Sequence, residues 1–363
     1  MEAKRQYRGK YIRFFISSTF ADMERERNAI RRIIDRIQRE YSARHGWQVE
    51  YVDLRWGISR EAGENNRTMS ICLDELRLCQ RLSPRPNFIV LLGERAGWFP
   101  LPEVMPAADM NRVMDRADSR ALLYIKTSYR FNSNILPDGA WVLEPRQSMR
   151  FDASEVESVL HALFSETFPA DSPYRLSATQ QEVVNGILSV PDSKDHVIAY
   201  LRTLDYRTVP TEERSKFCPD DNANGSPTEW HRRILDSSDP ANVSVVTGLD
   251  WCRYVSDSYV VEFEQEIERK IRRIIDREIS GYESRDEHEN ERLQHFDYAE
   301  RLSGDFIGRE SFINTVVDSV GTSDSPLLIS GKPGVGKSAL MGRLACELTN
   351  TGYYVCMRFS SLL

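Results

Sequence analysis

Apolar and polar positions near the N-terminus follow two different periods. Residues 11–16 form a continuous apolar run, which is typical of a buried strand, and the stretch after it repeats its apolar residues at helical spacing. The pattern predicts a strand over 11–16 and then a helix that Ser18 or Thr19 caps and Gly46 ends. The apolar residues of this helix share one face: Ile30, Ile33, Ile34, Ile37 and Tyr41.

The same alternation continues through the next segments of the chain. A second strand is predicted over 48–54, a short helix over 70–80 and a strongly apolar strand over 88–92, which ends at Gly93. The order β-α-β-α-β within about 90 residues is typical of α/β folds with a parallel sheet. We therefore expect a flavodoxin-like parallel sheet.

The next apolar strand candidate, residues 196–201, follows about 100 residues later, which is too far for a plain crossover. Helical patterns at 155–164 and 178–188 fill part of this interval, so we expect a helical insertion at about 100–190 within a domain spanning 1–205. Residues 206–300 are expected to form a helical connector and linker. This segment contains a long amphipathic helix (259–279) and a polar stretch (281–290).

The last 63 residues contain a complete phosphate-binding motif, Gly-Lys-Pro-Gly-Val-Gly-Lys-Ser at 331–338, between an apolar run and a helical pattern. In this strand–loop–helix setting the glycines let backbone N–H groups surround phosphates. Lys337 would reach the β- and γ-phosphates, and Ser338 would bind Mg²⁺. The glycines expected to shape the loop are Gly331, Gly334 and Gly336. We expect ATP as the ligand and read 301–363 as the truncated start of a P-loop NTPase domain, within a longer protein.

Composition narrows the function classes. The net charge of −7 argues against a dedicated nucleic-acid binder, and no apolar run approaches the length of a membrane span. The six cysteines are scattered, as in a reducing cytoplasm, and the six histidines have no metal-ligand spacing. The chain is expected to be cytoplasmic, with no membrane partner and no metal-dependent catalytic centre of its own.

A short element upstream of the P-loop, Phe306-Ile307-Gly308-Arg309-Glu310, resembles the FxGRE element of STAND proteins, which are NACHT- and NB-ARC-type signalling ATPases. The resemblance covers about 300–363 and implies that Phe306, Gly308 and Arg309 help to seat the nucleotide. It also implies that ATP controls a change from a monomer to a homo-oligomer. A further region, absent from this chain, would sense a trigger or partner protein.

The N-terminal segment carries a second resemblance. Phe-Ile-Ser-Ser-Thr-Phe at 15–20, Val-Asp-Leu-Arg-Trp-Gly-Ile at 52–58 and Cys-Leu-Asp-Glu-Leu at 72–76 are similar to the N-terminal domain of NACHT/WD-repeat and telomerase-associated proteins. Prokaryotic antiviral STAND proteins have similar domains. These domains are considered TIR-like, and the third motif is very similar to one of TIR domains.

The TIR-like resemblance implies a catalytic residue. In TIR domains that cleave NAD, the glutamate of this motif is the catalytic carboxylate, and it corresponds to Glu75. A carboxylate facing the ribose would stabilise the oxocarbenium-like charge that forms as nicotinamide leaves. The remaining candidates for the NAD pocket lie where strands end: Ser17, Ser18, Thr19, Asp53, Arg55, Trp56 and Gly93.

Each of these residues also has an ordinary structural interpretation. Glu75 on an amphipathic helix can form part of a solvated or salt-bridged face, and Asp53 and Arg55 can pair with each other or with charges of the first helix. Trp56 can anchor its loop in the core. These alternatives leave two functions open: a TIR-like effector that cleaves NAD in innate or antiphage defence, or a non-catalytic platform that assembles partners under NTPase control. A third, nuclease or other nucleotide glycosidase, is less favoured.

Overall fold

The structure of this protein is a computed structural model that describes residues 10–54, 66–83, 87–135, 137–148, 150–217, 227–283, 287–303, 306, 308–320, 322, 325–332 and 334–359. The chain divides into two compact units. One unit runs from Tyr11 to Arg277, and the other contains the P-loop and comprises the remaining residues.

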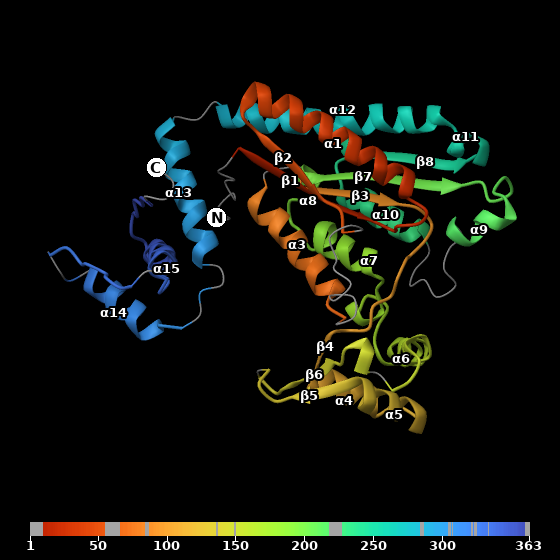
Figure 1. Ribbon diagram of the computed structural model, residues 1–363, viewed down its shortest axis with the longest axis horizontal. Coiled ribbons are helices and arrows are strands. Elements are labelled where there is room, and N and C mark those ends of the chain that lie inside the picture. Colours follow the sequence, from red (N-terminus) through yellow and green to blue (C-terminus); the bar gives the residue numbers. More distant parts are fainter. Residues whose placement is uncertain are drawn as a thin grey trace. The chain divides into compact units, whose positions relative to one another are not determined.

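The first unit is built on a five-stranded, all-parallel sheet with the order β2-β1-β3-β7-β8 (Figure 1). This is the flavodoxin-like α/β architecture that the sequence predicts. Its central strand β3 is completely buried. The strands are β1 (Tyr11–Ser18), β2 (Gln48–Val52), β3 (Phe88–Leu92), β7 (Val197–Leu204) and β8 (Val243–Leu249).

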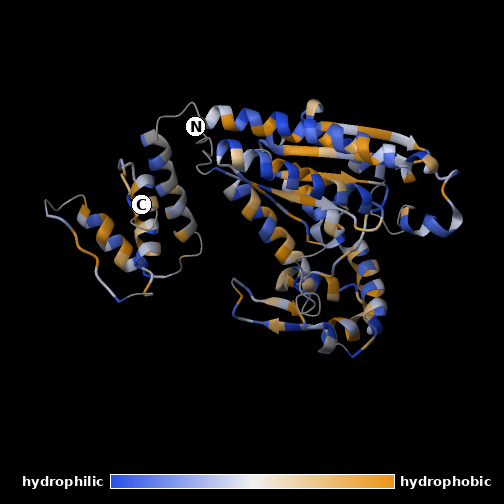
Figure 2. Ribbon diagram, turned by 45° about the horizontal axis from the view of Figure 1, so that its top comes forward, coloured by the Kyte–Doolittle hydropathy of each residue, from blue (hydrophilic) through white to orange (hydrophobic). Residues whose placement is uncertain are grey.

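Helices cover both faces of this sheet (Figure 1). Helices α1 (Glu24–His45) and α12 (Asp257–Glu283) lie on one face, and α3 (Thr68–Leu82), α7 (Ala178–Val183) and α10 (Pro227–Ser237) lie on the other. The predicted apolar face of α1 is buried, and Gly46 ends the helix in the left-handed conformation (φ 68°). In Figure 2 the orange, apolar positions of these helices turn towards the sheet, as amphipathic packing requires.

The predicted cap of α1 is wrong. The helix begins at Glu24, and Met23 occupies the N-cap position without a side-chain hydrogen bond. The Ser18 hydroxyl donates to the carbonyl of Thr19, and the Thr19 hydroxyl donates to Asp22. The hydroxyls after β1 are therefore used within the loop.

The first unit is longer than the predicted 1–205 domain. Strand β8 pairs in parallel with β7, and Phe263 of α12 packs edge-on against Tyr200 of β7 with ring centroids 4.7 Å apart. Both elements lie in the segment expected to be a helical connector, but they belong to the sheet domain. Helix α13 (Glu287–Ser303) also begins inside the stretch expected to be a linker.

The insertion between β3 and β7 is helical only in part. It contains a three-stranded antiparallel sheet with the order β4-β6-β5, which was not predicted, and its own apolar core. Its elements are β4 (Val104–Pro106), α4 (Ala107–Met114), α5 (Ser119–Ser128), β5 (Tyr129–Asn132), β6 (Ala140–Leu143) and α6 (Ala153–Thr167).

The helix predicted over 178–188 changes its winding half-way. Helix α7 continues directly into a π-helical turn, Val184–Leu188, before the short α8 (Ser193–His196) leads into β7. A Cβ on Gly186 would lie 2.6 Å from the Phe88 ring, so the turn packs its backbone against the centre of the sheet. The remaining helices of this unit are α9 (Thr211–Phe217) and α11 (Trp251–Val255).

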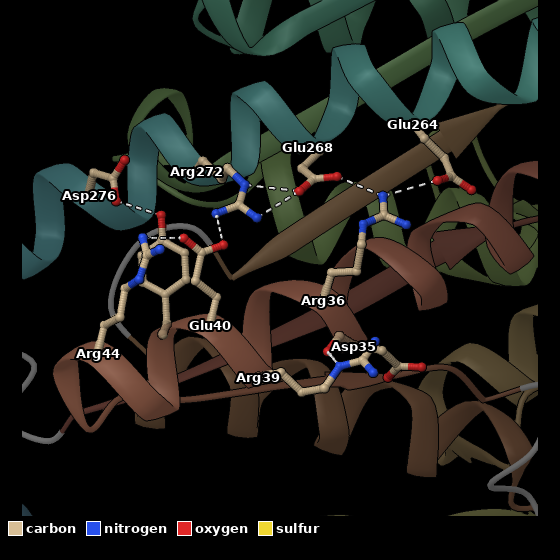
Figure 3. A network of polar contacts seen from close by, with 10 residues as sticks. Asp35, Arg36, Arg39, Glu40, Arg44, Glu264, Glu268, Arg272 and Asp276 are labelled. Atoms are coloured by element: carbon tan, nitrogen blue, oxygen red, sulfur yellow. Dashed lines mark hydrogen bonds and ion pairs between the residues drawn. The ribbon is translucent and has the colours of Figure 1, made fainter.

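Charged side chains join α1 to α12 on their solvent-facing sides (Figure 3). Arg36 bridges Glu264 (3.0 Å) and Glu268 (2.6 Å), and Arg272 pairs with Glu268 and Glu40 (both 2.8 Å). These side chains keep between about a sixth and two fifths of their surface in contact with solvent, so the network is only partly buried.

The second unit contains α13, α14 (Glu310–Val320) and α15 (Lys337–Asn350). Ile313 and Val316 of α14 pack against Leu340 and Leu344 of α15. The apolar runs on either side of the P-loop and α15, expected to be strands, do not form strands among the described residues. Leu328 and Tyr354 in these runs are 88% and 86% exposed.

Candidate functional site

A cleft of about 380 Å³ lies at the carboxyl ends of β1 and β3, where the strand order reverses. Open parallel sheets bind ligands at this position because helix N-termini and loops converge there. The loop after β1, the first turns of α3, the loop after β3 and the start of α7 all contribute to the lining. The lining includes Ser18, Thr19, Phe20, Asp22, Arg27, Cys72, Gly97, Trp98, Thr179 and Glu182.

The most unusual group of the cleft is the carboxyl of Glu182 on α7. The Ser17 hydroxyl donates a hydrogen bond of 2.6 Å to its Oε2. Burial raises the pKa of Glu182 to about 7, although the hydrogen bond from Ser17 and the charge of Arg27 act in the opposite direction. Near neutral pH this group can therefore take up or release a proton, which is what general acid–base chemistry requires.

The thiol of Cys72 on α3 lies beside Glu182. Burial, together with the negative charge of Glu182, raises the pKa of Cys72 to about 12. The thiol is therefore protonated at neutral pH and acts as a weak donor to the carboxylate, not as a nucleophile. It contributes to positioning Glu182.

Arg27 of α1 holds the end of β1 in place through hydrogen bonds to Ser18. Its guanidinium forms an ion pair of 2.5 Å with Asp53 and donates to the Ser18 hydroxyl (2.6 Å) and the Ser18 carbonyl (3.0 Å). Arg27 and Asp53 have side chains that are only 1% and 3% exposed. Of the alternatives for Asp53, pairing with a charge of the first helix is the one that the structure adopts. A buried pair of this kind positions a loop more than it binds a ligand.

Gly93 ends β3 and has a packing role. A Cβ at this position would clash with Oδ2 of Asp22, and the Gly93 carbonyl accepts a hydrogen bond of 2.9 Å from Nε2 of His231. Burial raises the pKa of Asp22, partly offset by the hydroxyl of Thr19. Gly93 thus lets the loop after β1 pack closely on the end of β3.

Glu75 lies away from this cleft. Its carboxylate pairs with Arg13 of β1 at 3.0 Å and lines a separate open groove, together with Glu50 of β2. The structure therefore does not bring Glu75 to the hydroxyls of Ser17 and Thr19. Of the alternatives for Glu75, the salt-bridged one matches its contact with Arg13. Its catalytic role stays a prediction. Arg55 and Trp56 lie outside the described residues.

Sequence reasoning missed Glu182, Cys72 and Asp22 as residues of the cleft. The available signal at Glu182 was its position on the predicted helix, four residues from Ala178 on one side and from Gly186 on the other. A glutamate in line with small residues on a helix face is a candidate for burial.

The second unit has the backbone geometry of a phosphate-binding loop. Gly334 and Gly336 have φ angles of 81° and 83°, and Gly336 is the N-cap of α15. Lys337 Nζ donates to the carbonyls of Gly331 (2.9 Å) and Lys332 (3.0 Å). These features fit a polyphosphate, because the helix N-terminus and the lysine ammonium both favour an anion.

The element resembling FxGRE lies against this loop. Arg309 itself has a positive φ of 63°, and its guanidinium donates to the carbonyl of Val335 at 3.0 Å. Phe306 packs against the small core formed by α14 and α15. This element therefore contacts the P-loop, while the nucleotide-binding roles of its residues and of Ser338 stay predictions.

Comparisons with known proteins find one family model and several longer relatives. The family described as "Domain of unknown function (DUF4062)" matches residues 13–128. NACHT domain- and WD repeat-containing protein 1 of mouse is 24% identical to this chain, over 90% of this chain and 23% of its own length. The human protein of the same name is 23% identical, over 85% of this chain and 22% of its own length. This chain is homologous to NACHT/WD-repeat proteins. The rat telomerase protein component 1 is 36% identical over 26% of this chain and 3% of its own length.

The mouse and human relatives are named for a NACHT domain, and this chain spans less than a quarter of their length. The match to a domain of unknown function does not identify the first unit as TIR-like. No solved structure matches the chain. Within the described residues, no helix is long and apolar enough to cross a membrane, and no group of three His, Cys, Asp or Glu side chains could hold a metal ion.

Proposed function

We propose that this chain is the effector region of a STAND-type signalling ATPase, in which ATP with Mg²⁺ controls the activity of the first unit. In this proposal Lys337 and Ser338 hold the phosphates and Mg²⁺, and nucleotide exchange favours a cytoplasmic homo-oligomer. The proposed trigger is a partner protein, and the matched NACHT/WD-repeat relative extends well beyond the part that aligns with this chain. Such a switch suits innate or antiphage defence.

The activity that we propose for the effector is hydrolysis of the nicotinamide–ribose bond of NAD. The C1′–N bond breaks, and its electron pair leaves with nicotinamide, which becomes neutral. A water oxygen then bonds to C1′ as one of its O–H bonds breaks, so that the products are ADP-ribose, nicotinamide and one proton. The enzyme needs a carboxylate that stabilises the ribosyl cation and takes up the proton.

The observation that carries this proposal is Glu182. Its carboxyl lies in the cleft at the sheet's switch point, has a pKa raised to about 7 by burial and accepts a hydrogen bond from Ser17. The ionised form is the one that stabilises positive charge, so the rate should increase as pH rises through about 7. Glu75, the residue implied by the TIR-like resemblance, is the competing candidate.

The test is release of nicotinamide from NAD by the purified chain, with and without ATP and Mg²⁺, followed by liquid chromatography. Glu182→Gln should lower the rate by about 100-fold, because general-base contributions reach this size. Glu75→Gln is the matched control, because it also replaces a carboxylate by an amide of the same shape. The rate of this variant should stay near that of the wild type. The opposite ranking would transfer the role to Glu75. An inactive wild type, with ATP present, would refute NAD cleavage.

The alternative is a non-catalytic platform, and the insertion supplies the observation that favours it. Its small sheet carries Val104 and Phe131, which are 42% and 47% exposed, and Phe131 lines an open groove of about 640 Å³. Exposed apolar side chains of this size are common at protein-binding surfaces. This function predicts that Phe131→Glu abolishes ATP-dependent association in light scattering, while Glu182→Gln has no effect on it.

A further inference from the structure

Two large aromatic side chains line the cleft and remain exposed to solvent. Phe20 follows the hydroxyl-rich end of β1 and is 54% exposed, and Trp98 follows β3 and is 42% exposed. Both belong to the same unit and to the same cleft as Glu182. Burial of these two rings would stabilise the fold, so exposing both of them has an energetic cost. Exposed apolar side chains that lie together at one site are typical of a binding surface.

Direct packing between two loops brings these rings to the same rim. A Cβ on Gly97 would lie 2.9 Å from Cγ2 of Thr19, so the residues immediately beside Trp98 and Phe20 are in close contact. Gly97 has a φ of 86°, a conformation that favours glycine, and this lets the loop turn directly over Thr19. The juxtaposition is therefore built by the backbone.

The Phe20 ring and the backbone of Trp98 each have a fixed partner. The Arg27 guanidinium lies over the Phe20 ring, 5.0 Å from its centroid. The backbone N–H of Ala178 donates to the carbonyl of Trp98 at 2.8 Å, which ties the loop to the start of α7. The same helix carries Glu182 one turn further on, at a buried position of the cleft lining.

We propose that Phe20 and Trp98 form a stacking site for the heteroaromatic base of a nucleoside or nucleotide, with its sugar directed towards Glu182, whose carboxyl accepts the hydrogen bond from Ser17. A planar ring at an exposed rim and polar groups at a buried floor match a ligand with one flat aromatic end and one hydroxylated end. A cationic ring such as nicotinamide in its glycosidic form is favoured further, because the indole of Trp98 attracts cations to its face.

This inference rests on the proposed function for the identity of the sugar-binding floor, but it concerns binding and can be tested without catalysis. The probes are nicotinamide mononucleotide and ribose 5-phosphate, which differ by the base. Binding of each to the 363-residue chain is measured by isothermal titration calorimetry. The part of the tryptophan fluorescence quenching that is lost in Trp98→Phe gives a second signal, because the chain has six tryptophans. Wild type should bind nicotinamide mononucleotide more tightly than ribose 5-phosphate.

Substitutions separate stacking from general loss of structure. Trp98→Leu and Phe20→Leu should each weaken binding of nicotinamide mononucleotide by about ten-fold, the usual size of one base–aromatic stack, and leave ribose 5-phosphate unchanged. Trp98→Phe should restore most of the affinity. Phe131→Leu is the matched control, because this ring has a similar exposure (47%) but lies outside the cleft, and it should have no effect.

The possible outcomes distinguish the two proposals. Binding of nicotinamide mononucleotide that depends on Trp98, without any cleavage of NAD, supports the stacking site and refutes the proposed activity. Binding that is unchanged in both leucine variants overturns the stacking site, whatever the activity. If neither probe binds to folded wild-type protein, the stacking site is also overturned.

Discussion

Helix α1 carries charged residues on two faces, and they are used in opposite ways. On the outer face, Arg36 and Glu40 join the half-exposed network with α12 (Figure 3). On the inner face, Glu26 and Arg27 are completely buried; Glu26 receives the Tyr259 hydroxyl at 2.5 Å and lies 3.3 Å from Arg202. Water screens the outer pairs, whereas the inner ones depend on each partner remaining in place.

This difference has a functional meaning. The inner charges lie next to the cleft and fix the end of β1 and the loop after it. Arg27 donates to the Ser18 hydroxyl, and the Arg202 guanidinium donates to the Asp22 carbonyl at 2.8 Å. Buried charge is a costly way to stabilise a fold, but it holds a site in one arrangement. The outer network only fastens one helix to another.

The largest effect is expected from breaking an inner pair. Asp53→Ala leaves the Arg27 guanidinium buried without its carboxylate, which should lower the free energy of unfolding by about 3–5 kcal/mol. Urea unfolding monitored by circular dichroism measures this. The double variant Arg27→Met/Asp53→Leu should recover much of the loss, because no charge is left stranded. A loss below about 1 kcal/mol in Asp53→Ala would mean that the inner and outer pairs do not differ.

A change of opposite sign is expected at Glu182. Its folded-state pKa of about 7 exceeds the ordinary value of 4.5, so the folded protein binds the proton more tightly than the unfolded chain does. This contribution is fully present below about pH 4.5 and is lost as pH rises through 7. Glu182→Gln should therefore be more stable than wild type at pH 8, by up to about 3 kcal/mol, and the difference should shrink towards pH 5.

The measurement for Glu182 is the urea midpoint of both proteins between pH 5 and pH 8. Glu75→Gln serves as the reference, because it removes a carboxylate from a half-exposed ion pair with Arg13 and should not stabilise the protein at any pH. Equal pH profiles for wild type and Glu182→Gln would show that this carboxyl is ordinary.

The smallest effect is expected on the outer face. Arg36→Ala removes contacts to Glu264 and Glu268 and should cost about 0.5–1 kcal/mol at low salt. Because salt screens charges near the surface, the cost should decrease at about 1 M NaCl, where the screening length is about 3 Å. The same urea experiment at two salt concentrations tests this. A cost that is large and independent of salt would place Arg36 in the same class as Arg27.

The sequence predicts the frame of the first unit better than its edges. The apolar face of α1 from Ile30 to Tyr41 and the continuous apolar run of β3 can both be read from neighbouring residues in the sequence. Both predictions were confirmed. Strand β8 was missed because it follows a polar, loop-like stretch, and the strands of the insertion have only three or four residues, too few to show a period.

The cleft was located but its chemistry was not. Strand ends point to the hydroxyls of Ser17 and Thr19, because every parallel strand ends at the same edge. Glu182 lies 165 residues from Ser17, and only tertiary packing makes it buried. Local motif similarity pointed instead to Glu75, whose carboxylate lies beside Arg13.

The π-helical turn after Glu182 sets the rotational phase of α7. Each residue of an α-helix advances by about 100° and each residue of a π-helix by less, so re-winding the same residues 184–188 as regular α-helix would turn α7 by roughly 90–100° relative to β7. Glu182 would then swing away from Ser17, and Gly186 would no longer face the Phe88 ring. The wide turn thus holds one residue more than an α-helical turn would, and its winding decides which face of α7 meets the sheet.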